Sequence, residues 1–458
     1  MRQQLLALVS AGLILFAILQ VWRRRDIFHP VCMQSILLAL LIGVRVPYIL
    51  WVHADYMPPG VDILSSLYHA VIFYSGFLVL AAFTYKCAGY MSFPCTEAYC
   101  TLRWTTLQTP AAASIYVTAG VAGIWILAAK FSLSSFLANL VEDRSVFAGN
   151  WALFYMLIVP LWAAVVCYVC ILSGDRRPWI KALMVSAFGV TILGALLSGF
   201  RSMIIQALIP VMLLRSRASR KIGIMAGFTI VLAVVAIFPV MDGILYGKLW
   251  PDLIRADWGS VVSYYEDNTL RLMQYAYGRY YTLEGTARTL ESLDSGAVNF
   301  DHGRLILAFP KILLPTVIVG SKPSASVEIG RIFFADRYGT SSDVACVTSL
   351  PAFMYWQAGW LGYIIGAVFY GLFVRYWVTI YEKVTMASQI FIACTYSYFY
   401  LVFSGHVAGW AELIYIQLML LPVLRIHVSQ PGNVTTSNLQ YDLAREAYKS
   451  ILSPERSP

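Results

Sequence analysis

Charged side chains are scarce in this chain of 458 residues. Lysine, arginine, aspartate and glutamate make up 12% of it, while hydrophobic residues make up 59%, against about 25% and about 45–50% in soluble domains. Because so few charges cannot cover a soluble globule of this length, the composition predicts an all-α, polytopic membrane protein. It also excludes a disordered chain and a disulfide scaffold. The net charge of +9 then indicates basic cytoplasmic loops and no nucleic-acid partner.

Motifs for common cofactors are also missing. The chain contains no GxxxxGK[ST] loop, no HExxH pair and no GxSxG elbow, and the long loop described below has no DxD motif. These absences predict neither a bound cofactor nor a metal site. The eight cysteines do not form a disulfide framework, because only Cys346 is expected on the outer side of the membrane.

Long apolar segments are abundant instead. About 20 apolar residues cross the hydrocarbon core of a bilayer, and the sequence contains eleven candidate spans. They are Gln3–Trp22, Val31–Val52, Ile63–Tyr85, Ala111–Ala129, Trp151–Leu172, Trp179–Leu197, Ser202–Leu214, Ile222–Val240, Pro351–Trp377, Met386–Phe403 and Trp410–Leu424.

The basic residues predict the orientation of these spans. One set of alternate connections, with the C-terminal tail, holds 18 lysines and arginines, whereas the other short connections hold only Lys130, Arg144 and Arg201. Since basic residues concentrate on the cytoplasmic side, the N-terminus is expected outside and the C-terminus inside. Residues 1–240 then hold spans one to eight, 241–350 a large outer loop, 351–425 spans nine to eleven, and 426–458 a cytoplasmic tail.

The outer loop of 110 residues has internal organisation. Apolar residues repeat on one face over Asn268–Leu293, which predicts a helix. Leu305–Val319 is apolar but interrupted by two prolines, and it is too short to span, so a re-entrant or membrane-surface segment is expected. Ser324–Asp336 predicts a further helix, with Ser324 as N-cap and Glu328 in its first turns.

Ionisable residues inside the spans gather in the outer third of the membrane. Arg45 lies near the outer end of the second span, and Arg201 precedes the short seventh span. His406 and Glu412 lie near the outer end of the eleventh. Intramembrane charges are functional hypotheses by default, and a polar chamber open to the outside would explain them. A structural ion pair between Arg45 and Glu412 is the alternative.

Several short motifs resemble those of Wzy-type polymerases, which polymerise the repeat units of O-antigen, capsule and enterobacterial common antigen. The resemblance covers residues 180–380 best, and the large late outer loop adds to it. The motifs are Gly199-Phe200-Arg201, Phe309-Pro310-Lys311 through Gly320-Ser321-Lys322-Pro323-Ser324, Glu328-Ile329-Gly330-Arg331 through Phe334, and Tyr355-Trp356-Gln357-Ala358-Gly359-Trp360-Leu361-Gly362.

The resemblance implies a metal-independent membrane glycosyltransferase of GT-C-like architecture. It would join undecaprenyl-pyrophosphate-linked oligosaccharides on the periplasmic face of the bacterial inner membrane, with the lipid bilayer and a chain-length regulator protein as further partners. Arg201 and Arg279 would offset the charge of the leaving pyrophosphate. His302, Asp301 or Glu328 would act as general base, with His406 as a further candidate. Substrate-binding residues would be Arg45, Arg304, Lys322, Arg331, His406 and Glu412.

Three alternatives remain open at this point. An O-antigen ligase, which transfers glycan from the lipid carrier to lipid A-core, shares the same architecture. A transporter or flippase should carry polar residues through the midplane into the inner half of the membrane, whereas the ionisable residues identified above stop in the outer third. A non-catalytic assembly scaffold predicts that no single charge in the loop is essential.

Overall fold

The computed structural model describes residues 2–51, 57–90, 108–130, 151–172, 177–198, 209–216, 249, 252, 255–278, 281–308, 311, 325–341, 346, 348–382 and 386–396. These residues form helices and turns, with no strand among them, as the composition predicts. The membrane-type helices are α1 (Arg2–Arg24), α2 (Pro30–Leu38), the π-helix η1 (Ala39–Val44), α3 (Arg45–Trp51), α4 (Ile63–Cys87), α6 (Gln108–Lys130), α9 (Trp151–Leu172), α10 (Pro178–Ser198), α21 (Leu350–Glu382) and α22 (Met386–Thr395). A short 3-10 turn, η2 (Ala88–Tyr90), ends α4, and the outer loop contributes α14 (Trp258–Gly278), α15 (Thr282–Asp294), α16 (Arg304–Leu307), α19 (Ala325–Phe333) and α20 (Ala335–Tyr338).

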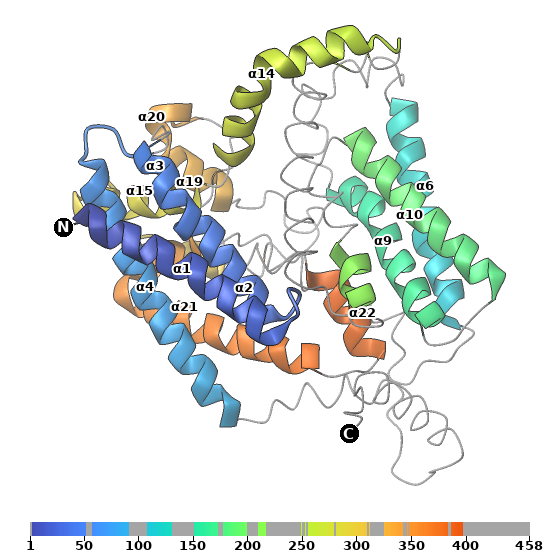
Figure 1. The fold of residues 1–458 in the computed structure, drawn as a ribbon, viewed down its shortest axis with the longest axis horizontal. Coiled ribbons are helices and arrows are strands. Elements are labelled where there is room, and N and C mark those ends of the chain that lie inside the picture. Colours follow the sequence, from blue (N-terminus) through green and yellow to red (C-terminus); the bar gives the residue numbers. More distant parts are fainter. Residues whose placement is uncertain are drawn as a thin grey trace, which may run out of the picture.

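Two groups of long helices make up the described part of the molecule (Figure 1). The first contains α1, the continuous helix α2–η1–α3, α4 and α21, and the second contains α6, α9 and α10. Helix α22 contacts both α9 and α21 and so joins the groups. The loop helices α15, α19 and α20 lie together at one end of the first group.

Four of these helices are long and apolar enough to cross a membrane: α1, α2–η1–α3, α4 and α21. Shorter apolar stretches lie in α6, α9 and α10. All seven coincide with predicted spans. The predicted spans Ile222–Val240 and Trp410–Leu424 lie outside the described residues, and two others are described only in part. The total of eleven and the GT-C-like arrangement therefore remain predictions.

Close contacts of glycines reveal the relative helix directions. A side chain at Gly76 of α4 would meet Tyr363 of α21, and one at Gly371 of α21 would meet Ala81, one turn further along α4. These two helices therefore run parallel. Helices α6 and α9 run antiparallel: Gly120 lies against Pro160, so closely that an added Cβ would sit 2.2 Å from its ring, and Gly123, later in α6, lies against Met156, earlier in α9. Both directions agree with the predicted alternation of spans, while the absolute orientation remains a prediction.

The second span contains a π-helical segment with a physical cause in the sequence. Pro47 has no backbone N–H, so it cannot donate to the carbonyl of Gly43 four residues earlier. The hydroxyl of Ser10 on α1 donates to that carbonyl oxygen at 2.7 Å instead. Helix α1 can approach this closely because residue 43 is glycine: a Cβ at this position would lie 3.0 Å from the side chain of Ile14. The rearranged turn ends immediately before Arg45.

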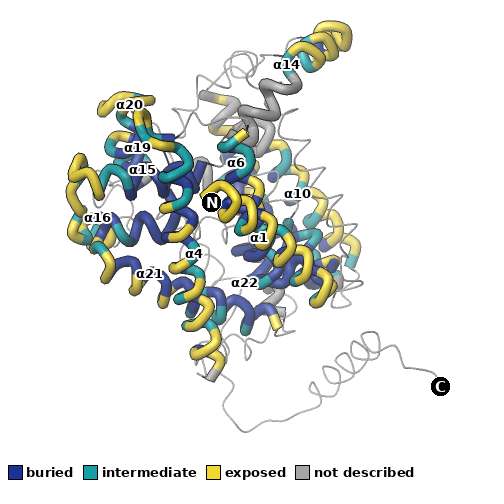
Figure 2. The backbone as a smooth tube through the Cα atoms, turned by 60° about the vertical axis from the view of Figure 1, so that its left-hand side comes forward, coloured by how far each residue is buried: buried dark blue, intermediate teal, exposed yellow. Residues whose placement is uncertain are grey.

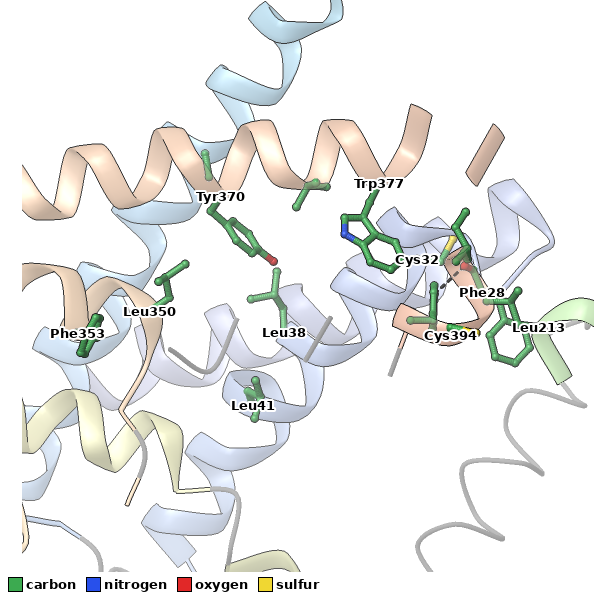
Figure 3. Packing of buried hydrophobic residues seen from close by; sticks show 14 of the residues in the cluster. Phe28, Cys32, Leu38, Leu41, Leu213, Leu350, Phe353, Tyr370, Trp377 and Cys394 are labelled. Atoms are coloured by element: carbon green, nitrogen blue, oxygen red, sulfur yellow. Dashed lines mark hydrogen bonds between the residues drawn. The ribbon is translucent and has the colours of Figure 1, made fainter. Parts of the chain in front are cut away.

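The core of the first group lies between α2 and α21. Figure 3 shows Tyr370 of α21 directed toward Leu38 of α2, while Trp377 lies further along beside Cys32. All four side chains are buried. Helix α15 is also buried, over Thr282–Leu290, whereas the part of α14 whose burial is described, residues 258–268, is largely exposed (Figure 2). The six described cysteines are free thiols.

The loop helices correct two predictions. The predicted helix Asn268–Leu293 is two helices, because α14 ends at Gly278 and α15 begins at Thr282. Apolar periodicity alone cannot place such a break. The predicted helix Ser324–Asp336 is also divided, because α19 ends at Phe333 and α20 begins at Ala335. Glu328 lies in the first turn of α19, as predicted, and Ser324 lies outside the described residues. Most of Leu305–Val319 is likewise outside them, apart from the end of α16, Ala308 and Lys311.

Candidate functional site

A kink lies near the N-terminal end of α21. Ala358 (φ −151°, ψ 27°) and Gly359 (φ 59°, ψ −147°) leave helical geometry, and the conformation of Gly359 is accessible almost only to glycine. Gly362 is equally constrained, because an added Cβ would lie 2.1 Å from the carbonyl oxygen of Met354. These two glycines belong to the aromatic-glycine motif found in the sequence, so the motif marks a break between loop and span.

The kink anchors the segment that contains three predicted site residues. The backbone N–H of Asp301 donates to the carbonyl of Trp356 at 3.0 Å, and that of Gly303 donates to Gln357 at 2.7 Å. The side chain of Gln357, which is fully buried, accepts from the backbone N–H of Leu305 at 3.2 Å. Residues 301–305 are therefore fixed at the top of α21 by backbone geometry.

Three predicted residues meet there in what we call the Arg304 cluster, formed by Asp301, Arg304 and Glu328. Nε of Arg304 donates to Asp301 at 3.0 Å, and its terminal nitrogens donate to both carboxylate oxygens of Glu328 on α19. The hydrogen bonds of Glu328 and of Asp301 raise the pKa of Arg304. The Arg304 side chain nevertheless remains 58% exposed, whereas the Asp301 side chain is 10% exposed and that of Glu328 21%. With one guanidinium and two carboxylates, the cluster has a formal net charge of −1, and its arginine is the most exposed of the three side chains.

His302 lies within the turn that carries the cluster. Its φ is 51°, in the left-handed region, and Gly303 follows with a φ of 79°. Such a conformation is uncommon for a non-glycine residue and is often found at functional sites. The His302 side chain is exposed. Three of the proposed bases are described. Arg304 forms ion pairs with two of them, Asp301 and Glu328, and not with His302.

Arg45 has a partner that sequence spacing did not reveal. Its Nε donates to Glu284 of α15 at 3.0 Å and 3.2 Å, and Nη2 donates at 2.5 Å. Both side chains are 1% exposed. The structural ion pair considered for Arg45 therefore exists, but with Glu284 of the outer loop; Glu412 lies outside the described residues. A buried, doubly bonded guanidinium is unavailable to a substrate.

A second buried arginine, Arg288, fastens the loop helices to one another. It lies one turn beyond Glu284 on α15 and donates to Asp336 at 2.5 Å and 3.1 Å. It also donates to the carbonyls of Phe333 and Met57. Burial favours the neutral form of Asp336, but the hydrogen bonds and charge of Arg288 outweigh it and lower the pKa of this carboxyl. Arg45 and Arg288 together fix α15 to the second span and to α20.

Glu284 and Arg288 were missed by the sequence analysis, and one signal was present. They are spaced i, i+4 in Thr282-Leu283-Glu284-Gly285-Thr286-Ala287-Arg288, where every other residue except Leu283 is small or bears a hydroxyl. Such residues suit a buried helix that bonds through hydroxyls. Thr286 donates to Ser349 at 2.7 Å, for example.

The other predicted site residues fall into two sets. Arg331 is exposed on α19, the helix that also carries Glu328. Arg201, Arg279, Lys322, His406 and Glu412 lie outside the described residues. The structure therefore brings together Asp301, Arg304 and Glu328, with His302 in the same turn, and the rest of the predicted site stays a prediction.

Buried polar groups also lie deep within the spans. Gln34 of α2 and Tyr370 of α21 are buried within the spans, and Tyr370 lies about 18 Å from the end of α21 at Glu382. At that end, Tyr381 donates to the buried carboxylate of Asp26 at 2.8 Å. Only ionisable residues were placed by depth from the sequence, so these buried glutamine and tyrosine side chains were not identified there. The expectation that the ionisable residues within the spans lie in the outer third stays a prediction.

Neither the described metal-ligating side chains nor the comparisons with known proteins indicate a function. In the stretches of chain listed above, no group of three or more histidine, cysteine, aspartate or glutamate side chains is arranged to hold a metal ion. Comparison with protein-family models, curated proteins and solved structures finds no match.

Proposed function

We propose that this protein polymerises oligosaccharide units carried on undecaprenyl pyrophosphate, acting as a membrane glycosyltransferase on the periplasmic face of the bacterial inner membrane. The observation that carries the proposal is the Arg304 cluster, which combines an exposed arginine side chain, two carboxylates and an adjacent exposed histidine at the top of an apolar helix. A diphosphate on a lipid tail presents an anion at this depth. A planar guanidinium matches phosphate oxygens bidentately, so Arg304 would exchange its hydrogen bonds to Glu328 for bonds to the diphosphate.

The proposed reaction needs one proton acceptor and one stabilised leaving group. The acceptor hydroxyl gives its proton to a general base, and its oxygen forms a bond to the anomeric carbon of the donor. The bond from that carbon to the pyrophosphate oxygen breaks, and the electron pair leaves with undecaprenyl pyrophosphate. Arg304 offsets the charge that develops on this group, together with Arg201 and Arg279 as the family resemblance implies.

His302 is the preferred base in this proposal. Asp301 and Glu328 both hold Arg304, so either must give up an ion pair before it can accept a proton. The imidazole of histidine commonly serves as a general base in enzymes. Its exposed, left-handed position in the turn also leaves room for a sugar hydroxyl. His406 remains the alternative base from the sequence.

Transport of a lipid-linked glycan is the second candidate function. The buried Gln34 and Tyr370, and the Asp26–Tyr381 pair at the far end of α21, favour it, because a transporter needs polar groups through the depth of the membrane. These groups are also consistent with hydrogen bonds that fix helix packing. Transport, however, gives no role to the exposed Arg304 and His302.

The proposal is tested with purified protein in lipid vesicles supplied with a polyprenyl-pyrophosphate oligosaccharide. A ladder of products on a gel is the expected result. A single transfer to added lipid A-core, without a ladder, would identify a ligase. Movement of the lipid-linked glycan across the vesicle membrane without a new glycosidic bond would identify a transporter.

A further inference from the structure

Beyond the kink, α21 presents one exposed apolar face. Its exposed side chains recur at intervals of one, three and four residues, which places them on one side of a helix. This face is the surface that a spanning helix presents to lipid. The residues are Trp360, Leu361, Ile364, Ile365, Val368 and Phe369.

The length of this helix places the kink at a membrane boundary. From Trp360 to Glu382, α21 is about 34 Å long, and the hydrocarbon core is about 30 Å thick. The straight part alone therefore spans the membrane, and Gly359 marks its outer limit. Trp360 supports this placement, because tryptophan concentrates at the membrane–water interface. This residue is 61% exposed, and its ring packs against Tyr355 and Tyr363 at centroid distances of 5.1 Å and 5.3 Å.

The segment that carries the Arg304 cluster exposes apolar side chains at this same level. Phe300 packs on Tyr355 at 5.5 Å, and it is 36% exposed. Ile306 and Leu307 of α16 are 36% and 78% exposed. In Figure 2, α16 and the outer part of α21 lie along the same edge of the molecule. Since the backbone bonds to Trp356 and Gln357 hold residues 301–305 within one turn of the kink, these side chains lie at the membrane boundary.

We infer that residues 300–307 are immersed in the outer interface of the bilayer, so that the loop, as well as the spans, contacts lipid. The partner is the lipid surface itself, because the exposed side chains of this turn continue the lipid-facing side of α21. The immersed turn sets the depth of the Arg304 cluster at the level of lipid phosphates. The immersion of residues 300–307 is inferred independently of the proposed function. The use of this depth to bind a lipid-linked diphosphate rests on the proposed function.

The test uses a fluorescent amino acid placed at one position of the full-length, otherwise unchanged chain by codon suppression, in nanodiscs. The positions are 307, 361 as a reference in the span, and 297 as an exposed control between α15 and α16. Lipids brominated on the acyl chain quench a probe in the membrane, and aqueous iodide quenches a probe in water. Position 306 serves as a second site if the variant at 307 does not fold.

At 307 we expect at least twofold stronger quenching by brominated lipid than at 297, and correspondingly weaker quenching by iodide. Equal iodide quenching at 307 and 297, with brominated lipid affecting 361 alone, would overturn the inference. The measurement needs neither substrate nor turnover. Its outcome is therefore distinguishable from failure of the proposed polymerase activity.

Discussion

Arg45 illustrates how a single buried charge is made tolerable in a span. Its guanidinium and the carboxylate of Glu284 are both 1% exposed and joined by several hydrogen bonds. Removing one partner of such a pair leaves the other buried and unpaired, which typically costs about 3–5 kcal/mol. Replacing both partners by apolar side chains is often close to neutral.

We therefore predict that Arg45→Met lowers the unfolding temperature in nanodiscs strongly, and that Arg45→Met with Glu284→Met restores most of the loss. A double-mutant cycle on thermal unfolding measures the coupling. If the loss in the double variant equalled the sum of the losses in the two single variants, a direct ion pair would be contradicted. Wild-type polymer lengths from the double variant are also expected, since neither residue reaches substrate.

His302 should affect turnover without affecting stability. Because a general base acts in the transition state, His302→Ala is expected to reduce the polymerisation rate by about 10²–10⁴-fold and leave donor binding largely intact. His69→Ala is the matched control, since His69 is an exposed histidine near the start of α4. If His302→Ala produced polymer of wild-type length, His302 would not be the base, and the role would fall to Glu328, Asp301 or His406.

At the scale of elements, the glycine break in α21 holds the site in place. Gly359→Ala places a Cβ on a backbone that is nearly restricted to glycine, at a cost of about 1–3 kcal/mol. We expect lower thermal stability and loss of activity, because the carbonyls that hold Asp301 and Gly303 belong to the turn just before it. Gly12→Ala on α1 is the control; its added Cβ meets no atom within 4 Å. Equal effects of the two substitutions would rule out a special role for the kink.

The elements also show what a sequence can and cannot predict. Long apolar runs predict α1, α4 and α21 because a membrane imposes length and composition on each helix separately. The break between α14 and α15 was missed, since apolar periodicity continues across it. The Arg45–Glu284 pair joins residues 239 positions apart, and no local pattern encodes such a partner. Asp301, Arg304 and Glu328 were identified singly, but only the fold shows that they touch.

At the scale of the whole molecule, the predicted orientation depends on the distribution of basic residues. Lysines and arginines are concentrated in one set of alternate connections, and cytoplasmic loops carry such an excess. A reporter active only in the cytoplasm should therefore function when fused after Arg220 or Gln430 and fail at Ser295. Activity at Ser295 would place the Arg304 cluster on the cytoplasmic side and remove the basis of the proposed function.

The most direct measurement is a polymerisation assay that compares Arg304→Ala with Arg255→Ala in the purified full-length protein. Arg255 is an exposed arginine of the same loop that takes no part in the Arg304 cluster. With a polyprenyl-pyrophosphate oligosaccharide in lipid vesicles, the wild type and Arg255→Ala should produce a product ladder, and folded Arg304→Ala should produce little or none. No ladder from the wild type, or an undiminished ladder from Arg304→Ala, would contradict the assignment of this cluster as the site of glycosyl transfer.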